Sequence, residues 1–227
     1  MKKTAFSVFA WFILACTIYF VLLAIFHVHG EKKADSNEQG IYLTLVNKTH
    51  QLPDNWEDRI ILVTDKDPWG DDVLIEQKTL EQFKKLQAAL LDRGVDIYLD
   101  SVYRSVDDQI ALWNNFKEEY GEKYCQKYVA VPGYSEHHTG LAVDVCIELD
   151  GEYVNDNDVM LAQADLFNEV HTLMPQFGFI LRYPKGKEDI TGYSYEPWHL
   201  RYVGDPKIAK EITEKDLTLE EYLNQQK

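Results

Sequence analysis

The segment LAVDVCIELDGEYV (residues 141–154) decides the expected fold. Its first nine residues are rich in β-branched side chains, which predicts a strand. The pair Asp150-Gly151 that follows is a strong signal for a tight hairpin turn, and the next three residues supply the returning strand. The sequence therefore predicts an antiparallel hairpin, with Asp144 on its longer strand.

Helical patterns lie on both sides of this hairpin. Residues 79–93 carry apolar side chains at helical spacing, begin with a Thr-x-x-Gln capping box and stop at Gly94. The other predicted elements are a helix capped by Ser105 and running to Tyr120, a helix over about 158–174, a helical tail after Pro206, and extended segments over 41–46, 59–63, 95–99, 179–182 and 199–202. This mix predicts an α+β domain in which a small antiparallel sheet is flanked by helices.

The N-terminal region carries a separate signal. Lys2 and Lys3 precede an uncharged run, Thr4 to Phe26, and a helix of that length rises roughly 35 Å, enough to cross a hydrocarbon core of about 30 Å. Positively charged flanks tend to stay in the cytoplasm. We therefore expect a single-pass protein of the cell membrane, divided into a cytoplasmic stub (1–3), a transmembrane helix (4–28), a linker (29–40) and an extracellular domain (41–227).

Two other interpretations of the N-terminus are open. One is a cleaved signal peptide, and the other is a lipoprotein signal, because Ile13-Leu14-Ala15-Cys16 loosely matches a lipobox. The apolar run continues past Cys16 and no small-residue cleavage pattern closes it, which favours the uncleaved anchor.

The net charge excludes one class of partner, and the cysteines leave two interpretations open. The net charge is −15 and no Lys/Arg-rich stretch occurs, so the electrostatic basis for nucleic-acid binding is missing and no such partner is expected. Outside the apolar run the cysteines are Cys125 and Cys146. They can either form a disulfide or serve as two separate small hydrophobic side chains.

Two short histidine-containing segments indicate where the chemistry lies: SEHHTGLAVD (residues 135–144) and EPWH (residues 196–199). A catalytic zinc site needs three protein ligands, typically imidazoles and a carboxylate, and an open fourth position for water. His137, Asp144 and His199 can supply the three ligands.

Glu196 is a candidate general base. It lies three residues before His199 on a segment stiffened by Pro197, so its carboxylate can approach the water that zinc activates without being a ligand itself. Spacing alone leaves a second interpretation open, in which these side chains are ordinary loop polar groups and a satisfied core histidine.

Five segments, in order, closely resemble the VanY-type D-alanyl-D-alanine carboxypeptidases. They are LVNKTHQLP (45–53), SVYRS (101–105), GYSEHHTGLAVDV (133–145), FGFILRYPKGKEDITGY (177–193) and EPWHLRYVG (196–204). The resemblance covers nearly all of residues 41–204. It implies a hedgehog/DD-peptidase-like domain that binds one zinc ion.

The resemblance also assigns the chemistry to residues. It implies that His137, Asp144 and His199 bind the zinc and that Glu196 is the base. His138 falls at a variable position of the motif and is expected to be a neighbour only.

Substrate contacts follow in the same way. The resemblance implies that Arg104 and Gln109 contact the substrate, and a guanidinium beside helix-terminal amides is a good receptor for a free C-terminal carboxylate. Arg104 can also stabilise the oxyanion. Ser135 is expected either to bind substrate or to cap its loop, and Trp198 is expected in the wall of the substrate pocket.

The expected function is removal of the terminal D-alanine from peptidoglycan stem peptides or lipid-linked precursors, in wall maturation or glycopeptide resistance. An L,D-carboxypeptidase acting on tetrapeptide stems is the main alternative, because the motifs are shared. A non-catalytic zinc module that binds wall peptides is a further alternative, against which the retained Glu196 argues.

Overall fold

The computed structural model describes residues 40–226, except for the side chains of 126–128. The predicted transmembrane helix (4–28) and all of the predicted linker (29–40) except Gly40 lie outside the described part. Between residues 40 and 226 there is no helix long and apolar enough to cross a membrane.

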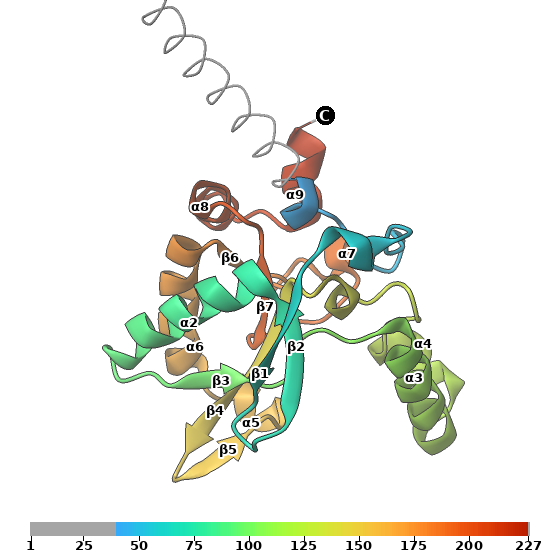
Figure 1. The fold of residues 1–227 in the computed structure, drawn as a ribbon, viewed down its shortest axis with the longest axis horizontal. Helices are drawn as coiled ribbons and strands as arrows, with labels where there is room; N and C mark the ends of the chain where they lie inside the picture. The colour runs from blue at the N-terminus through green and yellow to red at the C-terminus, as the bar shows by residue number, and fades with distance from the viewer. Residues whose placement is uncertain (1–39, 227) are drawn as a thin grey trace, which may run out of the picture. The chain divides into compact units, whose positions relative to one another are not determined.

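The central sheet has five antiparallel strands in the order β3-β4-β7-β6, with β5 paired to β4 (Figure 1). Their bounds are β3 Ile97–Leu99, β4 Ala142–Leu149, β5 Glu152–Val154, β6 Phe179–Leu181 and β7 His199–Tyr202. The register between β4 and β7 sets Asp144 directly opposite His199. The long strand of the predicted hairpin is therefore the central strand of the sheet and carries part of the site.

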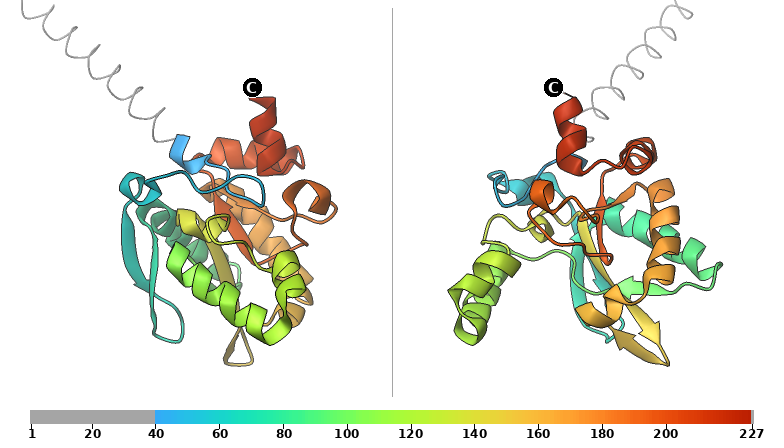
Figure 2. Two further views of the ribbon diagram at one scale, coloured as in Figure 1. Left: turned by 90° about the vertical axis from the view of Figure 1, so that its right-hand side faces the viewer. Right: turned by 180° about the vertical axis from the view of Figure 1, so that it is seen from behind.

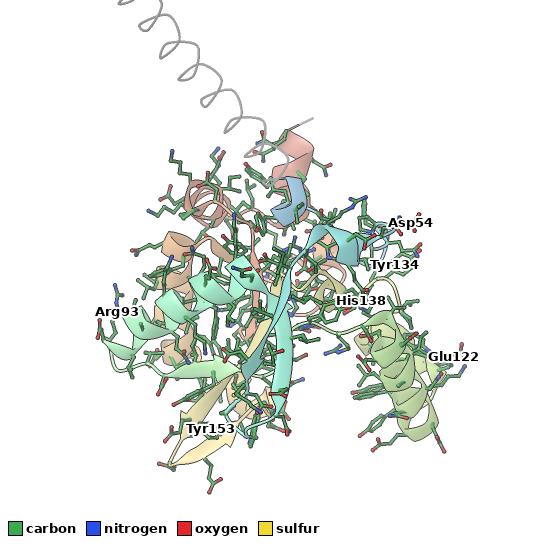
Figure 3. All side chains as sticks on the ribbon, viewed as in Figure 1. Asp54, Arg93, Glu122, Tyr134, His138 and Tyr153 are labelled. Carbon is green, nitrogen blue, oxygen red and sulfur yellow. The ribbon has the colours of Figure 1, made fainter. Side chains whose placement is uncertain are left out.

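The turn between β4 and β5 has the predicted chemistry. Asp150 and Gly151 both have positive φ, 53° and 86°, as a type I′ turn requires of its two central residues. Near the far end of this hairpin Tyr153 packs edge-on against Tyr98 and Trp69 (Figure 3). The hairpin prediction is confirmed.

Helices lie on both sides of the sheet. Helices α2 and α6 contact each other on one side, whereas α3 and α4 form a separate helical hairpin on the other (Figures 1 and 2). The helices are α2 Gln77–Leu91, α3 Val106–Tyr120, α4 Glu122–Tyr128, α5 Asn157–Leu161, α6 Ala164–Leu173, α7 Glu188–Thr191, α8 Pro206–Glu214 and α9 Leu219–Gln225, with short 3₁₀ turns η1 Trp56–Arg59, η2 Glu136–Thr139 and η3 Met174–Phe177. The α+β class predicted from the sequence is confirmed.

The core lies between the sheet and the pair α2 and α6. Phe83 and Leu90 of α2 and Phe167 and Val170 of α6 are at most 1% exposed. Each buried side chain of this size contributes roughly 1.5–3 kcal/mol relative to an exposed one. Cys146 is also buried and, like the buried Cys125, is a free thiol, so the two do not form a disulfide.

The start of α2 differs from the prediction. The helix begins at Gln77 rather than after Thr79, because the Glu76 side chain is the N-cap and accepts a hydrogen bond from the Thr79 backbone N–H at 2.8 Å. Strand β2 (Asp72–Glu76) therefore runs directly into the helix. It pairs with β1 (Leu62–Lys66) in a separate two-stranded hairpin.

Three further expectations are wrong in detail. The helix predicted over 158–174 is two helices, α5 and α6. Asp156 caps the first, which ends at Leu161, and the second begins at Ala164. Residues 41–46 do not form a strand. The helical spacing of apolar residues in α3 predicts that Ile110 faces inward, but Ile110 is 43% exposed, because this helix lies beside the site cavity rather than over the core.

Candidate active site

Strand pairing places two of the three expected metal ligands side by side. Asp144 and His199 are direct cross-strand partners, so their side chains project from the same face of the sheet. His199 Nδ1 lies 2.7 Å from Asp144 Oδ1, and His137 Nε2 lies 3.2 Å from Asp144 Oδ2. One ligand atom from each residue can be chosen so that all lie within 4.8 Å of one another. All three side chains can thus bind one metal ion.

The turn η2 carries His137 to the strands. It ends at Gly140, which has φ 69°. A Cβ at this position would lie 3.2 Å from the backbone N of Glu76, so both the conformation and the packing favour glycine. Strand β4 begins two residues after Gly140, so this short connection keeps His137 close to Asp144.

Hydrogen bonds behind the two imidazoles determine which nitrogen faces the site. His137 Nδ1 lies 2.7 Å from the Val102 carbonyl oxygen, which can only accept, so Nδ1 carries the hydrogen and Nε2 is free. His199 Nε2 lies 3.2 Å from Glu136 Oε2, so in this ring Nε2 carries the hydrogen and Nδ1 is free. Such outer contacts orient histidines for metal binding.

The site needs a cation at its centre. Asp144 Oδ1 is buried and has no hydrogen-bond partner among the described residues, and the atom that faces it, His199 Nδ1, is an acceptor in the tautomer set by Glu136. Two facing acceptors repel each other unless a proton or a metal ion lies between them. Burial alone would lower the pKa of His199, but Asp144 and Glu136 raise it to about 10, which reflects this attraction for positive charge.

Two imidazole nitrogens and one carboxylate are a donor set of catalytic zinc sites with an open fourth position. Zinc binding would displace the proton that His199 and Asp144 share. The residues present therefore fit Zn²⁺, and the metal-ligand set predicted from the sequence is brought together by the fold.

Glu196 lies beside the ligands without joining them. Its Oε2 is 4.0 Å from His199 Nδ1, the nitrogen that faces the metal position. Burial raises the pKa of Glu196 to about 7, within the range that suits a general base, although the charge of a bound metal ion acts in the opposite direction. This geometry matches the predicted role.

Arg104 is held in place by its neighbours. Its Nη1 donates to Gln109 Oε1 at 2.9 Å and its Nη2 to Ser101 Oγ at 2.7 Å. The Gln109 amide in turn donates to the Ala130 carbonyl at 2.8 Å, so Gln109 orients the guanidinium as well as lining the cavity. Arg104 has five N–H groups, of which these two bonds use two, and the residue lines the cavity.

His138 braces the loop instead of binding metal. Its Nδ1 donates to the Arg104 carbonyl at 2.6 Å, and its Nε2 accepts from the Gly133 N–H at 3.1 Å. Burial lowers its pKa, which keeps the ring neutral. The residue lies between the sheet and α3 (Figure 3). His138 therefore ties the segment of Arg104 to the turn that carries His137.

These groups surround one cavity of about 300 Å³. Its lining includes the predicted site residues Arg104, Gln109, Ser135, His137, Asp144, Glu196 and His199. Trp198 is not part of the lining, and its backbone carbonyl instead accepts a hydrogen bond from Val145 N–H. A substrate contact by Trp198 stays a prediction without structural support, whereas Ser135 faces the cavity.

Sequence reasoning assigned no role to several residues of the site. Tyr183 and Tyr193 line the cavity next to Glu196, and Glu136 is fully buried behind His199. The signal for Glu136 was its place inside the SEHHTGLAVD segment, directly before His137. A charged residue in a loop is normally solvated, so that position alone did not indicate burial.

Comparison with known proteins decides the family. A sequence model described as VanY, D-alanyl-D-alanine carboxypeptidase, matches residues 72–205, which include all the residues described above as the site. The chain belongs to the VanY family. The chain is also similar to VanXYC of Enterococcus gallinarum, a bifunctional D-Ala-D-Ala dipeptidase and D-Ala-D-Ala carboxypeptidase. The two sequences are 40% identical over 188 residues, which cover 79% of this chain and 92% of that protein.

Solved VanY-family structures share the fold. The LdcB LD-carboxypeptidase superposes with a TM-score of 0.71 at 39% identity, covering 83% of this chain and 87% of that one. A mutant of the VanY D,D-pentapeptidase from a VanB-type vancomycin-resistance cassette, solved with Zn(II), gives a TM-score of 0.66 at 32% identity, covering 81% and 99%. Together with the His137, Asp144 and His199 group, this makes zinc the cofactor.

Proposed function

We propose that this VanY-family protein is a zinc-dependent carboxypeptidase that removes the C-terminal D-alanine from peptidoglycan stem peptides, with stems ending in D-alanyl-D-alanine as its substrates. The observation that carries the proposal is that groups suited to three separate roles line the same cavity. A zinc-binding triad, a buried carboxylate at Glu196 and an oriented guanidinium at Arg104 all line it. That combination suits hydrolysis of a peptide bond close to a free carboxylate.

Each residue has a distinct task in the reaction. Zinc, when bound, supplies Lewis acidity that polarises the scissile carbonyl and makes water a better nucleophile. Glu196 takes the proton of the attacking water and returns it to the leaving amine of D-alanine. Arg104 binds the terminal carboxylate through charge-assisted hydrogen bonds, while Gln109 and Ser101 hold the guanidinium in one orientation.

An L,D-carboxypeptidase is the second candidate. Similarity to the LdcB LD-carboxypeptidase at 39% identity favours it. Both activities release a terminal D-alanine and need the same triad, base and carboxylate receptor. They differ in the residue before the scissile bond, which is a D-residue in one case and an L-residue in the other.

Arg104→Lys should lower kcat/KM by about 10- to 100-fold, because hydrogen bonds to charged groups contribute about 1.5–3 kcal/mol and a lysine cannot reproduce the planar fork of arginine. Stems with an amidated C-terminus should be poor substrates of the wild type for the same reason. Both effects are measured by release of D-alanine from free-acid and amidated stems.

Arg93→Lys is the matched control for this change. Arg93 is exposed in the turn after the C-terminal end of α2 and pairs with Glu169 at 3.3 Å, so its replacement should leave kcat/KM unchanged (Figure 3). Equal turnover of amidated and free stems would point to an endopeptidase and remove the carboxylate-binding role from Arg104.

We also propose that residues 4–28 anchor the enzyme in the cell membrane as a single transmembrane helix, with the catalytic domain outside. The uncharged run and the two preceding lysines support this arrangement, which would place the enzyme beside lipid-linked precursors and nascent wall. Protease treatment of intact cells tests it, since a catalytic domain that is digested only after lysis would contradict the outward orientation.

A further inference from the structure

Four charged side chains lie buried behind the metal ligand His199. Arg182 and Arg201 are 0% exposed, Glu136 is 3% exposed and Glu220 is 8% exposed. Lone buried charges are strongly unfavourable, so such groups occur only where they are paired and hydrogen-bonded. The four form a connected cluster, and it extends from the zinc site to the C-terminal helix α9.

Glu136 is the member that touches the metal ligand. Its Oε1 accepts from Arg182 Nε at 2.8 Å and from Arg201 Nη1 at 2.5 Å, and its Oε2 faces His199 Nε2 at 3.2 Å. Two arginines thus hold one oxygen, which aims the other oxygen at the imidazole. A carboxylate oxygen only accepts, so the His199 hydrogen is kept on Nε2 and Nδ1 is left free for the metal.

Arg182 connects Glu136 to α9. Its Nη1 donates to Glu220 Oε2 at 2.9 Å and its Nη2 to Glu220 Oε1 at 2.7 Å, a two-bond arrangement that fixes the guanidinium plane. Asn47 Nδ2 also donates to Glu220 Oε1 at 2.9 Å. Glu220 lies outside residues 72–205, the part that matches the VanY family model.

Arg201 is fixed separately by the backbone. Its Nη2 donates to the carbonyls of Tyr42 and Thr44 at 3.0 and 2.8 Å, and its Nε to the carbonyl of Tyr202 at 3.0 Å. Backbone carbonyls therefore hold Arg201 in place, whereas Glu220 of α9 holds Arg182. Buried ion pairs are weak evidence for added stability, so orientation of His199 is the better account of why these charges are present.

We propose that Glu136 is the positioning residue for the zinc ligand His199, and that Glu220 of α9 supports it through Arg182, so that the C-terminal helix is part of the structure that holds the metal. The proposal rests on the zinc site of the proposed function. A metal-supporting role then falls to α9, a helix outside the residues 72–205 that match the VanY family model.

Glu136→Gln tests the first half. The glutamine carbonyl oxygen is the group that can accept from both arginines, which turns the amide NH₂ towards His199 Nε2. That arrangement favours the tautomer with hydrogen on Nδ1, the nitrogen needed by the metal. We expect zinc affinity to fall by about 10- to 100-fold, as is typical when a group that orients a ligand is changed.

The measurements are zinc dissociation constants from chelator competition and the visible absorption spectrum of the Co²⁺-substituted protein, both on the full chain. Far-UV circular dichroism shows whether each variant is folded at the temperature used. A loss of packing alone would not move the cobalt bands of a folded protein, whereas a changed orientation of His199 would.

Glu220→Gln tests the second half, with Glu221→Gln as its matched control. Glu220→Gln removes one acceptor from Arg182 and should weaken zinc binding by about 3- to 10-fold, less than a change in direct contact with the ligand. Glu221 is the next residue of α9 but bonds Lys187 and the Thr218 cap. Glutamine preserves that capping box, so Glu221→Gln should match the wild type.

Wild-type zinc affinity and an unchanged cobalt spectrum in folded Glu136→Gln would overturn the proposal. If that variant does not fold, Glu220→Gln decides, and zinc affinity equal to that of Glu221→Gln would overturn the role of α9 and of the cluster. A wild-type protein that binds no zinc would instead overturn the proposed function, which keeps the two failures distinct.

Discussion

Glu196→Gln is expected to keep zinc and to lose about 10²- to 10⁴-fold in kcat, the usual contribution of a general base. The amide has nearly the same size as the carboxylate, and Glu196 lies 4.0 Å from His199 Nδ1 rather than in the ligand set, so metal binding should be unaffected. What is lost is the ability to accept the proton of the attacking water. Zinc content and turnover of a free-acid stem are measured on the same sample.

Glu214→Gln is a suitable control because Glu214 is exposed at the end of α8. It should match the wild type in both measurements. Turnover of Glu196→Gln within a few-fold of the wild type would show that another group is the base.

Single replacement of His137, Asp144 or His199 by alanine is expected to weaken zinc binding by well over about 100-fold and to abolish turnover, since changes in groups that merely orient a ligand already cost about 10- to 100-fold. Each of these residues supplies one of three donors around a single position. Metal analysis after gel filtration and activity with and without added zinc provide the measurement.

His138→Ala is the discriminating control for this series. His138 is adjacent to His137 in sequence, yet its two ring nitrogens bond the Arg104 carbonyl and the Gly133 N–H. The variant should retain stoichiometric zinc while binding substrate less well. Retention of stoichiometric zinc by all three alanine variants of the triad would refute the ligand assignment.

The sequence predicted the parts of the fold whose signals are local. Asp150-Gly151 has the turn chemistry of a hairpin, and the hairpin is present. Ser105 caps α3 through the Asp108 N–H, and Gly121 ends it. The metal-ligand group His137, Asp144 and His199 was also predicted, because two short motifs contain all three residues.

The remaining features depend on contacts between distant segments. Arg182 and Glu220 are 38 positions apart, and Glu136 and Arg201 are 65 positions apart. Arginine and glutamate are mostly exposed in proteins, so their presence in the sequence does not indicate that these four side chains are buried together. The start of α2 was missed for a related reason, because Glu76 acts as a cap that its residue type does not favour.

The sequence also did not indicate that α3 faces the site cavity. The apolar spacing of α3 indicates a core helix, yet its fully buried side chain is Gln109, which holds Arg104. A helix that lines a cavity shows the same periodicity as one that covers a core, since both present apolar side chains on one face. The pattern therefore identified the helix and not what it faces.

The central claim is tested most directly by incubating the purified, zinc-loaded protein with synthetic stems and identifying the products by mass spectrometry. We predict loss of one D-alanine from a pentapeptide ending in D-alanyl-D-alanine, with loss of this activity on chelation. Cleavage confined to tetrapeptide stems would establish the L,D-carboxypeptidase instead. Binding of zinc and of free-acid stems without release of D-alanine from either would contradict the account and identify a non-catalytic module.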